Sequence, residues 1–301
     1  MITNYFKIGF RILLRQRSYT VLNVVGLAMG IAVFVFIYLY IQSEIRYDRH
    51  WTDKDQIYRV TSMFNLDGNI DSAALTPFRL ASEFEENYPE VLLAANLFYT
   101  DPSDINDMSS LVYNDEVFEV PDITLGNSDV FKIFDYRFTE GSPDKALNDP
   151  YTMVISTNVA RLIFQDEPAL GKKLKTLVRE YTITGVYEKQ CRPSHLSFDA
   201  VVSFSSLPER DIEMLRENWF WVNCNTYLKI ADTVNPAAFE KRFNNDFSEK
   251  IKDYITDNSL QLDGYGRYKL EPISDVHYNT TLHYDSPSNI DKSYLYIFGI
   301  I

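Results

Sequence analysis

The chain has 301 residues, of which 46% are hydrophobic and 15% aromatic, and its 42 acidic against 29 basic residues give a net charge of −13. This composition excludes a disordered chain, and it argues against a nucleic-acid binder, because phosphate affinity depends on clustered Lys and Arg. Two cysteines are too few for a disulfide framework or a Cys-based zinc cluster. The length allows one or two domains with a sizeable core.

Residues 1–18 are predicted to form an amphipathic basic helix. The first 20 residues contain four basic residues and no acidic one, a local charge of +4. Three of the four recur every fourth residue and so share one side of a helix, while apolar residues gather on another. Such a helix suits the inner leaflet, where its cations contact lipid headgroups or a cytoplasmic partner; the alternative is the plain basic flank of a membrane helix. The four cations are Lys7, Arg11, Arg15 and Arg17.

Residues 19–42 are predicted to cross the membrane. Val21 to Ile41 carries no charge, and as a helix it would be about 31 Å long, which matches the bilayer core. A signal peptide is the alternative, but no small-x-small cleavage site follows the apolar stretch. Because positive charges stay in the cytoplasm, the acidic region from residue 42 to 293 should lie outside it. The acidity of this outer region is expected of a solvated domain; the alternative is a surface that binds cations.

Two further features concern packing in the membrane. Gly26 and Gly30 form a G-x-x-x-G motif, which would let another helix approach closely; otherwise this side faces lipid. Residues 294–301, YLYIFGII, are apolar but too short to span. We interpret them as the start of a second transmembrane helix, with a buried terminal strand as the alternative.

The outer region alternates between strand and helix patterns. A helix is predicted after Thr76-Pro77, which reads as an N-cap and first helical residue, and a long helix is predicted after Asn235-Pro236. Asp67-Gly68 indicates a hairpin turn, and residues 101–110 indicate a loop or boundary. The predicted strands are 57–64, 91–98, 111–120, 152–156, 174–178, 181–186, 198–204, 221–230 and 267–271.

This pattern predicts an α+β fold in two parts. Residues 52–105 and 221–290 would form one α/β subdomain from two distant segments, and residues 106–220 would form an inserted β-rich subdomain. Cys191 and Cys224 would lie in this oxidising compartment, either bridged or as two buried free thiols.

The residues offer little support for an enzyme, and no cofactor is expected. The sequence contains no G-x-x-x-x-G-K-[ST] phosphate loop, so the chain should not hydrolyse ATP. His277 and His283 are only loosely spaced for a metal, and Ser194-His195 are neighbours, which does not place a nucleophile against a base. The acidic cluster of Glu83, Glu85 and Glu86 is expected on the solvent side of its helix.

Several stretches resemble the FtsX-like, MacB-like permeases of ABC transporters, in order and over nearly the whole chain. The resemblance rests on KIGFRILLRQRSYTVLNVVGLAMGIAVFVFIYLYIQSEIRYDRHWTDKDQIYRV, SDVFKIFDYRFTEGSPDKALNDPYTMVISTNVARLIFQDEPALGKKLK, ITGVYEK and SHLSFDAVVSF. One departure is Gln165, where such proteins usually have glycine, which puts that local turn in doubt.

The resemblance implies a bacterial inner-membrane permease with a periplasmic domain, whose α/β part would be porter-like. It implies mechanotransmission, in which a partner ABC ATPase hydrolyses ATP in the cytoplasm and the periplasmic domain moves in export or efflux. Implied partners are that ATPase, a second permease half or homodimer mate, membrane lipid, and a periplasmic adaptor or lipoprotein substrate. The alternative function is a membrane-anchored binding or sensor module that needs no ATPase.

Overall fold

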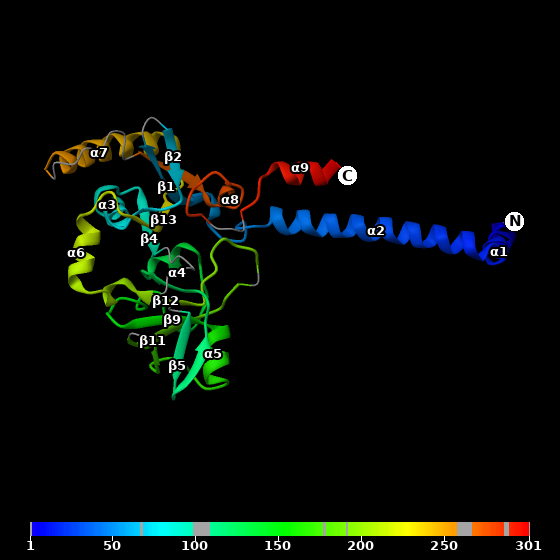
Figure 1. Ribbon diagram of the computed structural model, residues 1–301, viewed down its shortest axis with the longest axis horizontal. Coiled ribbons are helices and arrows are strands. Elements are labelled where there is room, and N and C mark those ends of the chain that lie inside the picture. The colour runs from blue at the N-terminus through cyan, green and yellow to red at the C-terminus, as the bar shows by residue number, and fades with distance from the viewer. Residues whose placement is uncertain are drawn as a thin grey trace. The chain divides into compact units, whose positions relative to one another are not determined.

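The computed structural model describes residues 2–66, 69–98, 109–176, 179–190, 192–257, 267–285 and 289–300. It forms two compact units, which are coloured along the chain in Figure 1. Residues 1–46 with 292–301 make up the helical unit, and residues 47–291 make up the sheet unit.

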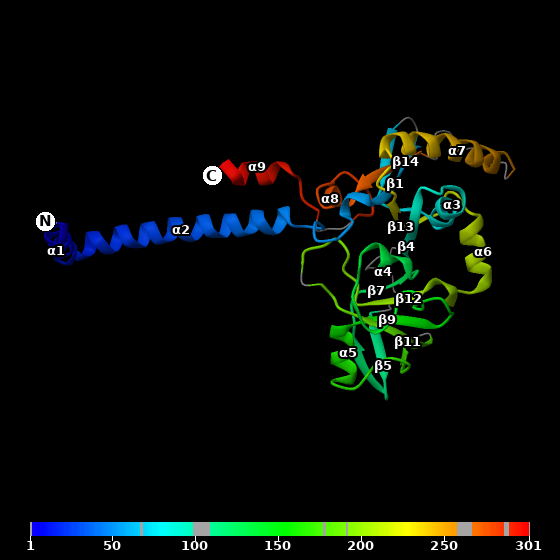
Figure 2. The same ribbon diagram turned by 180° about the vertical axis from the view of Figure 1, so that it is seen from behind.

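The helical unit contains α1 (Ile2–Arg15), α2 (Arg17–Ile45) and α9 (Ser293–Ile300). Helix α2 has 29 residues and buries none of them, so its length and apolar surface suit a bilayer, and it includes the predicted span 19–42. Helix α9 packs beside the C-terminal part of α2, where the rings of Tyr40 and Phe298 lie 5.8 Å apart (Figures 1 and 2). Residues 293–300 are therefore helical, and the alternative of a buried strand is wrong.

The sheet unit holds the remaining elements. Its helices are α3 (Arg79–Asn87), α4 (Asp129–Ile133), α5 (Thr157–Phe164), α6 (Glu209–Glu217), α7 (Pro236–Asp257) and α8 (Ile273–Val276), with 3₁₀ turns η1 (Lys54–Gln56) and η2 (Phe204–Ser206). Its strands are β1 (Ile57–Leu66), β2 (Asn69–Ala73), β3 (Thr76–Pro77), β4 (Val91–Phe98), β5 (Ser110–Tyr113), β6 (Glu116–Glu119), β7 (Ile123–Gly126), β8 (Phe138–Gly141), β9 (Thr152–Ser156), β10 (Lys173–Lys175), β11 (Glu180–Tyr187), β12 (Ala200–Ser203), β13 (Val222–Ile230) and β14 (Arg267–Pro272).

All these strands belong to one sheet, in the order β14-β1-β13-β4-β7-β12-β9-β11-β10-β5-β6, with β2, β3 and β8 attached at its sides. Strands β14, β1, β13 and β4 pair antiparallel, and β9 and β11 pair parallel, since α5 carries the chain across between them. Among the described residues, the strands of the two halves pair where Leu97 of β4 lies opposite Gly126 of β7. A Cβ on Gly126 would lie 2.9 Å from Leu97 Cδ2, so the absence of a side chain lets the strands approach.

Three hydrophobic clusters fill the sheet unit. One lies under α3 and α7, and a second lies between α5 and the strands around β9. The third includes Trp51, Phe134 and Tyr227 and joins residues from both halves of the sheet. The division into residues 52–105, 106–220 and 221–290 stays a prediction, since its boundary at 105/106 lies outside the described residues.

Two expected elements are wrong. Residues 111–120 form a hairpin instead of one strand, because Asn114 and Asp115 both adopt positive φ angles (50° and 65°) and turn the chain between β5 and β6. Thr76 is not an N-cap. Together with Pro77 it pairs with β13, its hydroxyl contacts Thr226, and α3 starts only at Arg79. The residue before a proline prefers extended backbone, which favours the strand.

The turn in doubt at Gln165 forms without glycine. Gln165 has a φ of 57° at the end of α5, and its N–H donates to the carbonyl of Arg161, which closes the helix. At the other end of α5, Ser156 is the N-cap, because its Oγ accepts from the N–H of Val159. The predicted turn residues 67–68 lie outside the described residues, although β1 and β2 pair on either side of them.

Candidate functional site

The strongest candidate site lies in the sheet unit and includes the residues that follow α2 in the chain. Residues 46–51, the N-terminal connector, directly follow α2. Asp48 in this connector is fully buried and has a φ of 52°, a backbone conformation that non-glycine residues rarely adopt. Its N–H donates to the carbonyl of Pro193 at 3.1 Å. Asp48 is thus part of the folded sheet unit.

The Asp48 carboxylate holds this turn in place. Its Oδ1 accepts from Trp51 Nε1 at 3.2 Å and from the Ser194 hydroxyl. Its Oδ2 lies 3.1 Å from the backbone N of His195 and 2.8 Å from Nδ1 of the same residue. Burial alone would raise the pKa of Asp48, but the His195 imidazole and the hydrogen bonds from His195 and Ser194 outweigh it and lower that pKa. The carboxylate is therefore ionised at neutral pH.

The imidazole of His195 carries the contact onward to the sheet. Its Nε2 lies 2.9 Å from the hydroxyl of Tyr227, which points from β13 into the shared core. Burial raises the pKa of Tyr227, so the phenol stays protonated at neutral pH. The connector is thereby joined through two side chains to a central strand.

A second connector leads back to the helical unit. Residues 277–291 follow α8 and precede α9, and they are fastened at several points. The N–H of Ile290 donates to the carbonyl of His277 at 2.9 Å, and Asn289 Nδ2 donates to the carbonyl of Asn279 at 2.9 Å. The ring of His277 stacks on Tyr47 at 3.5 Å between centroids, almost parallel at 8°. The two connectors therefore touch each other within the sheet unit.

Arg59 anchors the C-terminal connector to the sheet. This guanidinium is 1% exposed and makes four hydrogen bonds, two to Glu271 Oε2 at 2.9 and 2.7 Å and two to the Asp285 carboxylate at 2.6 and 2.8 Å. Asn279 Nδ2 donates to the other oxygen of Glu271 at 2.6 Å. The pairing with Asp285 is bidentate, which fixes both the position and the direction of that carboxylate.

These groups lie in one line across the sheet. Arg59 of β1 is directly opposite Tyr227 of β13 on one side and Glu271 of β14 on the other, so the three side chains share a face. Asp48 and His195 adjoin the row at Tyr227, and Asp285 adjoins it at Arg59. We call this set the polar row: Asp48, His195, Tyr227, Arg59, Glu271 and Asp285.

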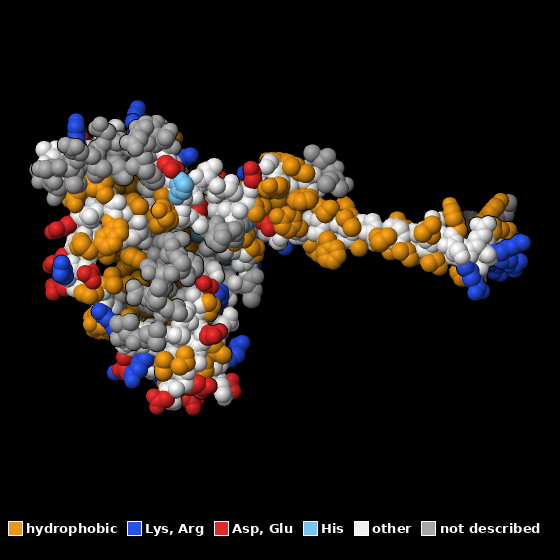
Figure 3. Space-filling view, viewed as in Figure 1, with side chains coloured by type: hydrophobic (Ala, Val, Ile, Leu, Met, Phe, Trp, Pro, Cys, Tyr) orange, Lys and Arg blue, Asp and Glu red, His pale blue; other side chains and the backbone are white. Residues whose placement is uncertain are grey.

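The site residues predicted from sequence lie in the helical unit. The basic side chains are exposed on α1 and at the start of α2, and Figure 3 shows Lys and Arg gathered at that end. Arg17 Nε also donates to the carbonyl of Leu14. A Cβ on Gly26 or Gly30 would meet nothing within 4 Å among the described residues, so this face is open to a partner. The structure brings none of these residues into the polar row.

Other expected features have structural roles. The hydroxyl of Ser194 donates to Asp48 and the imidazole of His195 faces Tyr227, so the pair holds no nucleophile–base contact. His283 pairs with Asp71 at 2.9 Å, and the described ranges contain no group of three metal-ligating side chains. Cys224 is a buried free thiol, whereas Cys191 lies outside the described residues.

Glu83 is not a plain surface residue, which corrects the expectation for the acidic cluster. Its carboxylate accepts from Arg79 at 2.8 Å and from Lys250 of α7 at 2.5 Å. Burial would raise the pKa of Glu83, but these two cations outweigh it and lower that pKa. Glu85 and Glu86 are both exposed as expected, and Glu85 also accepts from the N–H of Ala94.

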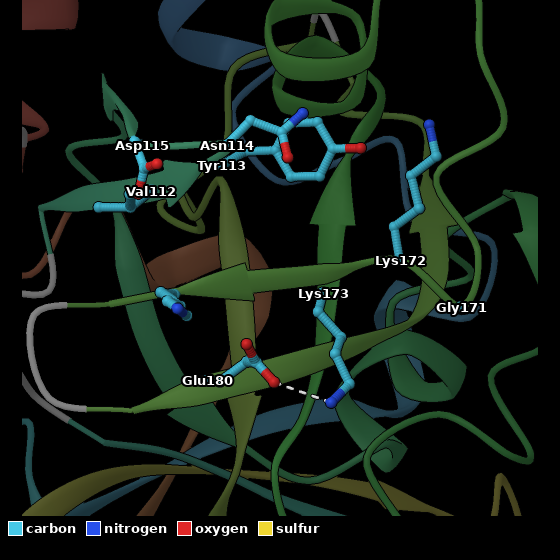
Figure 4. A pocket seen from close by; sticks show the side chains of 9 residues that line it. Val112, Tyr113, Asn114, Asp115, Gly171, Lys172, Lys173 and Glu180 are labelled. Carbon is cyan, nitrogen blue, oxygen red and sulfur yellow. Dashed lines mark hydrogen bonds and ion pairs between the residues drawn. The ribbon is translucent and has the colours of Figure 1, made fainter.

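A pocket of about 570 Å³ lies between the β5–β6 turn and β10 (Figure 4). It is lined by three lysines, but Lys173 pairs with Glu180 at 2.8 Å and Lys172 pairs with Glu167 at 2.6 Å. Figure 4 shows these two ammonium groups pointing in different directions. The cations do not converge on one ligand position, so the connectors remain the stronger candidate.

Sequence reasoning missed the polar row because its members are far apart in the chain. Asp48 and His195 are 147 positions apart, and Arg59 and Asp285 are 226 apart. One signal was present: Arg59 interrupts the apolar, β-branched strand IYRV, and a charge at such a position requires a buried partner.

Comparisons with known proteins agree with this architecture. The family model of the MacB-like periplasmic core domain matches residues 20–246. A domain assigned to a permease protein from Porphyromonas gingivalis has a TM-score of 0.61 at 22% identity, covering 74% of this chain and 92% of its own, and it supports the fold. No curated protein matches the chain.

Two further structures are similar at lower TM-scores. The periplasmic region of MacB from Actinobacillus actinomycetemcomitans has a TM-score of 0.45 at 15% identity, covering 72% of this chain and 89% of its own. The extracellular domain of the noncanonic ABC-type transporter YknZ from Gram-positive bacteria has a TM-score of 0.42 at 12% identity, covering 71% and 98%.

Proposed function

The chain belongs to the family of MacB-like periplasmic core domains, and on that premise we propose that it couples ATP hydrolysis by a cytoplasmic partner to movement of its periplasmic domain in export or efflux. The class of the protein follows directly from its family. The chain is a permease component of an ABC-type transporter, from a family that is not a class of enzymes, and it is an inner-membrane protein with an extracytoplasmic main domain. Permeases of this kind work with cytoplasmic ABC ATPases.

The observation that carries the proposal is the attachment of both connectors. Here the residue two positions after Arg46, the C-cap of α2, is buried and accepts four hydrogen bonds. Such a connector can transmit displacement, because its polar groups are satisfied only in this arrangement.

The basic helix would receive the motion on the cytoplasmic side. Lys7, Arg11 and Arg15 lie along one stripe of α1, exposed and separate from the apolar side chains of Phe10 and Leu13. We propose that they contact anionic headgroups, each worth about 1 kcal/mol near a charged leaflet, or acidic residues of the ATPase. Either contact, with headgroups or with the ATPase, would hold α1 parallel to the membrane.

The open face of α2 would receive a partner helix. At 100° per residue, Gly26 lies about 40° from Tyr40 around the helix axis, on the side where α9 packs. We propose that Gly26 and Gly30 pack against another helix of the same permease or against a homodimer mate. A periplasmic adaptor or a lipoprotein substrate would engage the sheet unit.

The test replaces Lys7, Arg11 and Arg15 together with Gln in the permease reconstituted with its ABC ATPase in proteoliposomes. We expect the ATPase to bind less tightly or to hydrolyse ATP without driving transport, while the sheet unit stays folded. A matched control replaces Lys172, Lys173 and Lys175 with Gln, which removes the same charge from the periplasmic side and should leave coupling intact.

Topology must be verified in the triple variant, because loss of positive charge can invert a helix. Coupled transport at the wild-type rate with correct topology would remove the coupling role of α1. If the wild-type permease neither binds an ABC ATPase nor changes its hydrolysis rate, the proposal is wrong, and a sensor module would be the better assignment.

A further inference from the structure

We infer that the polar row couples the two connectors energetically, so that a change at the connector of one membrane helix alters the stability of the other connector across three strands. The use of this coupling rests on the proposed function, in which both connectors must move with the periplasmic domain. The coupling itself is a property of the sheet unit and can be measured without an ATPase or a transported substrate.

The polar row leads from one connector to the other through two sets of hydrogen-bonded groups that meet at neighbouring strands. From Asp48 to His195 to Tyr227 the contacts are 2.8 and 2.9 Å, and from Arg59 to Asp285 they are 2.6 and 2.8 Å. Between these two parts, Tyr227 and Arg59 are direct cross-strand partners on one face. Charges on either side of this junction act on Tyr227, because Arg59 lowers its pKa while Asp285 and Asp48 raise it, even though burial is the largest cause of its shift.

The row also lies in surroundings of low dielectric. Arg59 and Tyr227 are 1% and 2% exposed, and the side chains of Asp48 and His195 are 0% and 4% exposed. Water cannot screen a change of charge or position at one member, so its neighbours must adjust. A row of exposed groups would lose this coupling to solvent.

The polar row is attached to each connector at one residue, Asp48 in the N-terminal connector and Asp285 in the C-terminal one. Asp48 holds a left-handed backbone turn that would relax if its carboxylate lost partners. Asp285 fastens the segment before α9 through two parallel hydrogen bonds to one guanidinium. Each connector can therefore open locally, and each opening removes partners from the same row.

The connectors have a second point of contact, the stack of Tyr47 on His277. This contact is short and direct, so it is the main competing path for any coupling. Its ring pair can be removed without touching the row, because neither residue belongs to it. The experiment must therefore measure coupling with the stack present and with the stack absent.

The experiment uses the full chain in lipid nanodiscs, with hydrogen–deuterium exchange resolved to single amides. The amides of Asp48 and His195 report on the N-terminal connector, and the amide of Ile290 reports on the C-terminal one. Amides of β9 and β11 serve as the reference for global opening. Asp285→Asn should speed exchange at Asp48 and His195 about fivefold or more over the reference, although it lies on the other connector.

Two further measurements test whether the coupling acts in both directions and whether it passes through Tyr227. Asp48→Asn should speed exchange at Ile290 by a similar factor, since a coupling free energy is the same in both directions. Tyr227→Phe keeps the ring but interrupts the row at its centre. In that background, Asp285→Asn should no longer change exchange at Asp48, and this loss of effect is the non-additivity expected of a shared network.

Two controls separate coupling through the row from general loosening of β13 and from coupling through the ring stack. Thr226→Val removes buried hydrogen bonds to Thr76 and Asn96 from the position beside Tyr227, on the opposite face of β13, and should leave both connectors unchanged relative to the reference. If it acts like Tyr227→Phe, the effect is general loosening of β13 and the inference is wrong. In a Tyr47→Leu background the coupling should persist; its disappearance would assign it to the ring stack.

The result that overturns the inference most directly is an effect of Asp285→Asn confined to its own connector. That outcome would leave the proposed function standing, because each connector could still transmit force by itself. Conversely, a permease that binds no ATPase but shows reciprocal exchange effects would retain the coupling and lose the transport role.

Discussion

Replacement of Arg59 by Leu is expected to be among the most destabilising single substitutions in the sheet unit. The guanidinium is 1% exposed and forms four hydrogen bonds with Glu271 and Asp285, whose side chains are 9% and 8% exposed. Leu would fill part of the volume but would leave two buried carboxylates without a counter-charge. Uncompensated charge, more than lost attraction, is therefore the source of the cost.

The magnitude follows from this geometry. Removal of one partner from a buried pair costs about 3–5 kcal/mol. For a unit of 150–250 residues, each kcal/mol lowers Tm by about 2–4 °C, so Arg59→Leu should lower Tm by about 6–20 °C. Adding Glu271→Gln and Asp285→Asn to the variant should recover about 2 kcal/mol or more. Both introduced amides are neutral, and the amide oxygen that Glu271→Gln provides can still accept from Asn279.

The assay is urea unfolding of the full chain in detergent micelles, followed by fluorescence of the buried Trp51 and Trp219. A matched control is Lys54→Met, which removes the exposed ion pair with Asp55 and should change stability by less than about 1 kcal/mol. The reasoning is refuted if the triple variant is less stable than Arg59→Leu alone, since charge imbalance would then not be the main cost.

Two further predictions concern a turn and acid stability. Gly141→Ala should destabilise the sheet unit by about 2 kcal/mol or more, because its φ is +77° and a Cβ would lie 2.4 Å from the Thr184 carbonyl oxygen. Gly171→Ala, with a φ of +79° and an open surrounding, should cost only about 1 kcal/mol, and equal losses would contradict the steric argument. The lowered pKa of Asp48 stabilises the fold above the ordinary value of 3.8, and this contribution is lost as the pH falls through the folded-state value. The free energy of unfolding should therefore fall with decreasing pH below about 4, less steeply in Asp48→Asn than in wild type; parallel curves would show that this carboxylate gains nothing from its partners.

Local signals in the sequence account for much of the secondary structure. The uncharged stretch 21–41 is longer than a core helix needs, and it lies within α2. Asn235-Pro236 predicts the start of α7, where Asn235 Oδ1 accepts from the N–H of Ala238. Where two local signals competed, the prediction was wrong: Thr76-Pro77 suits both a helix start and an extended segment, and pairing with β13 selects the strand.

The sequence by itself determined the membrane helix, its basic flank, the α+β character and the family resemblance, because each depends on periodicity, composition or segments that are contiguous in the chain. Only the tertiary structure decided how the connectors are held. In the sequence, Asp48 cannot be distinguished from the many other acidic residues; its role follows from its contacts with the loop at 193–195. The partners of Arg59 lie 212 and 226 positions away in the chain. A buried charge signals that partners must exist, but the order of strands across the sheet determines which ones they are.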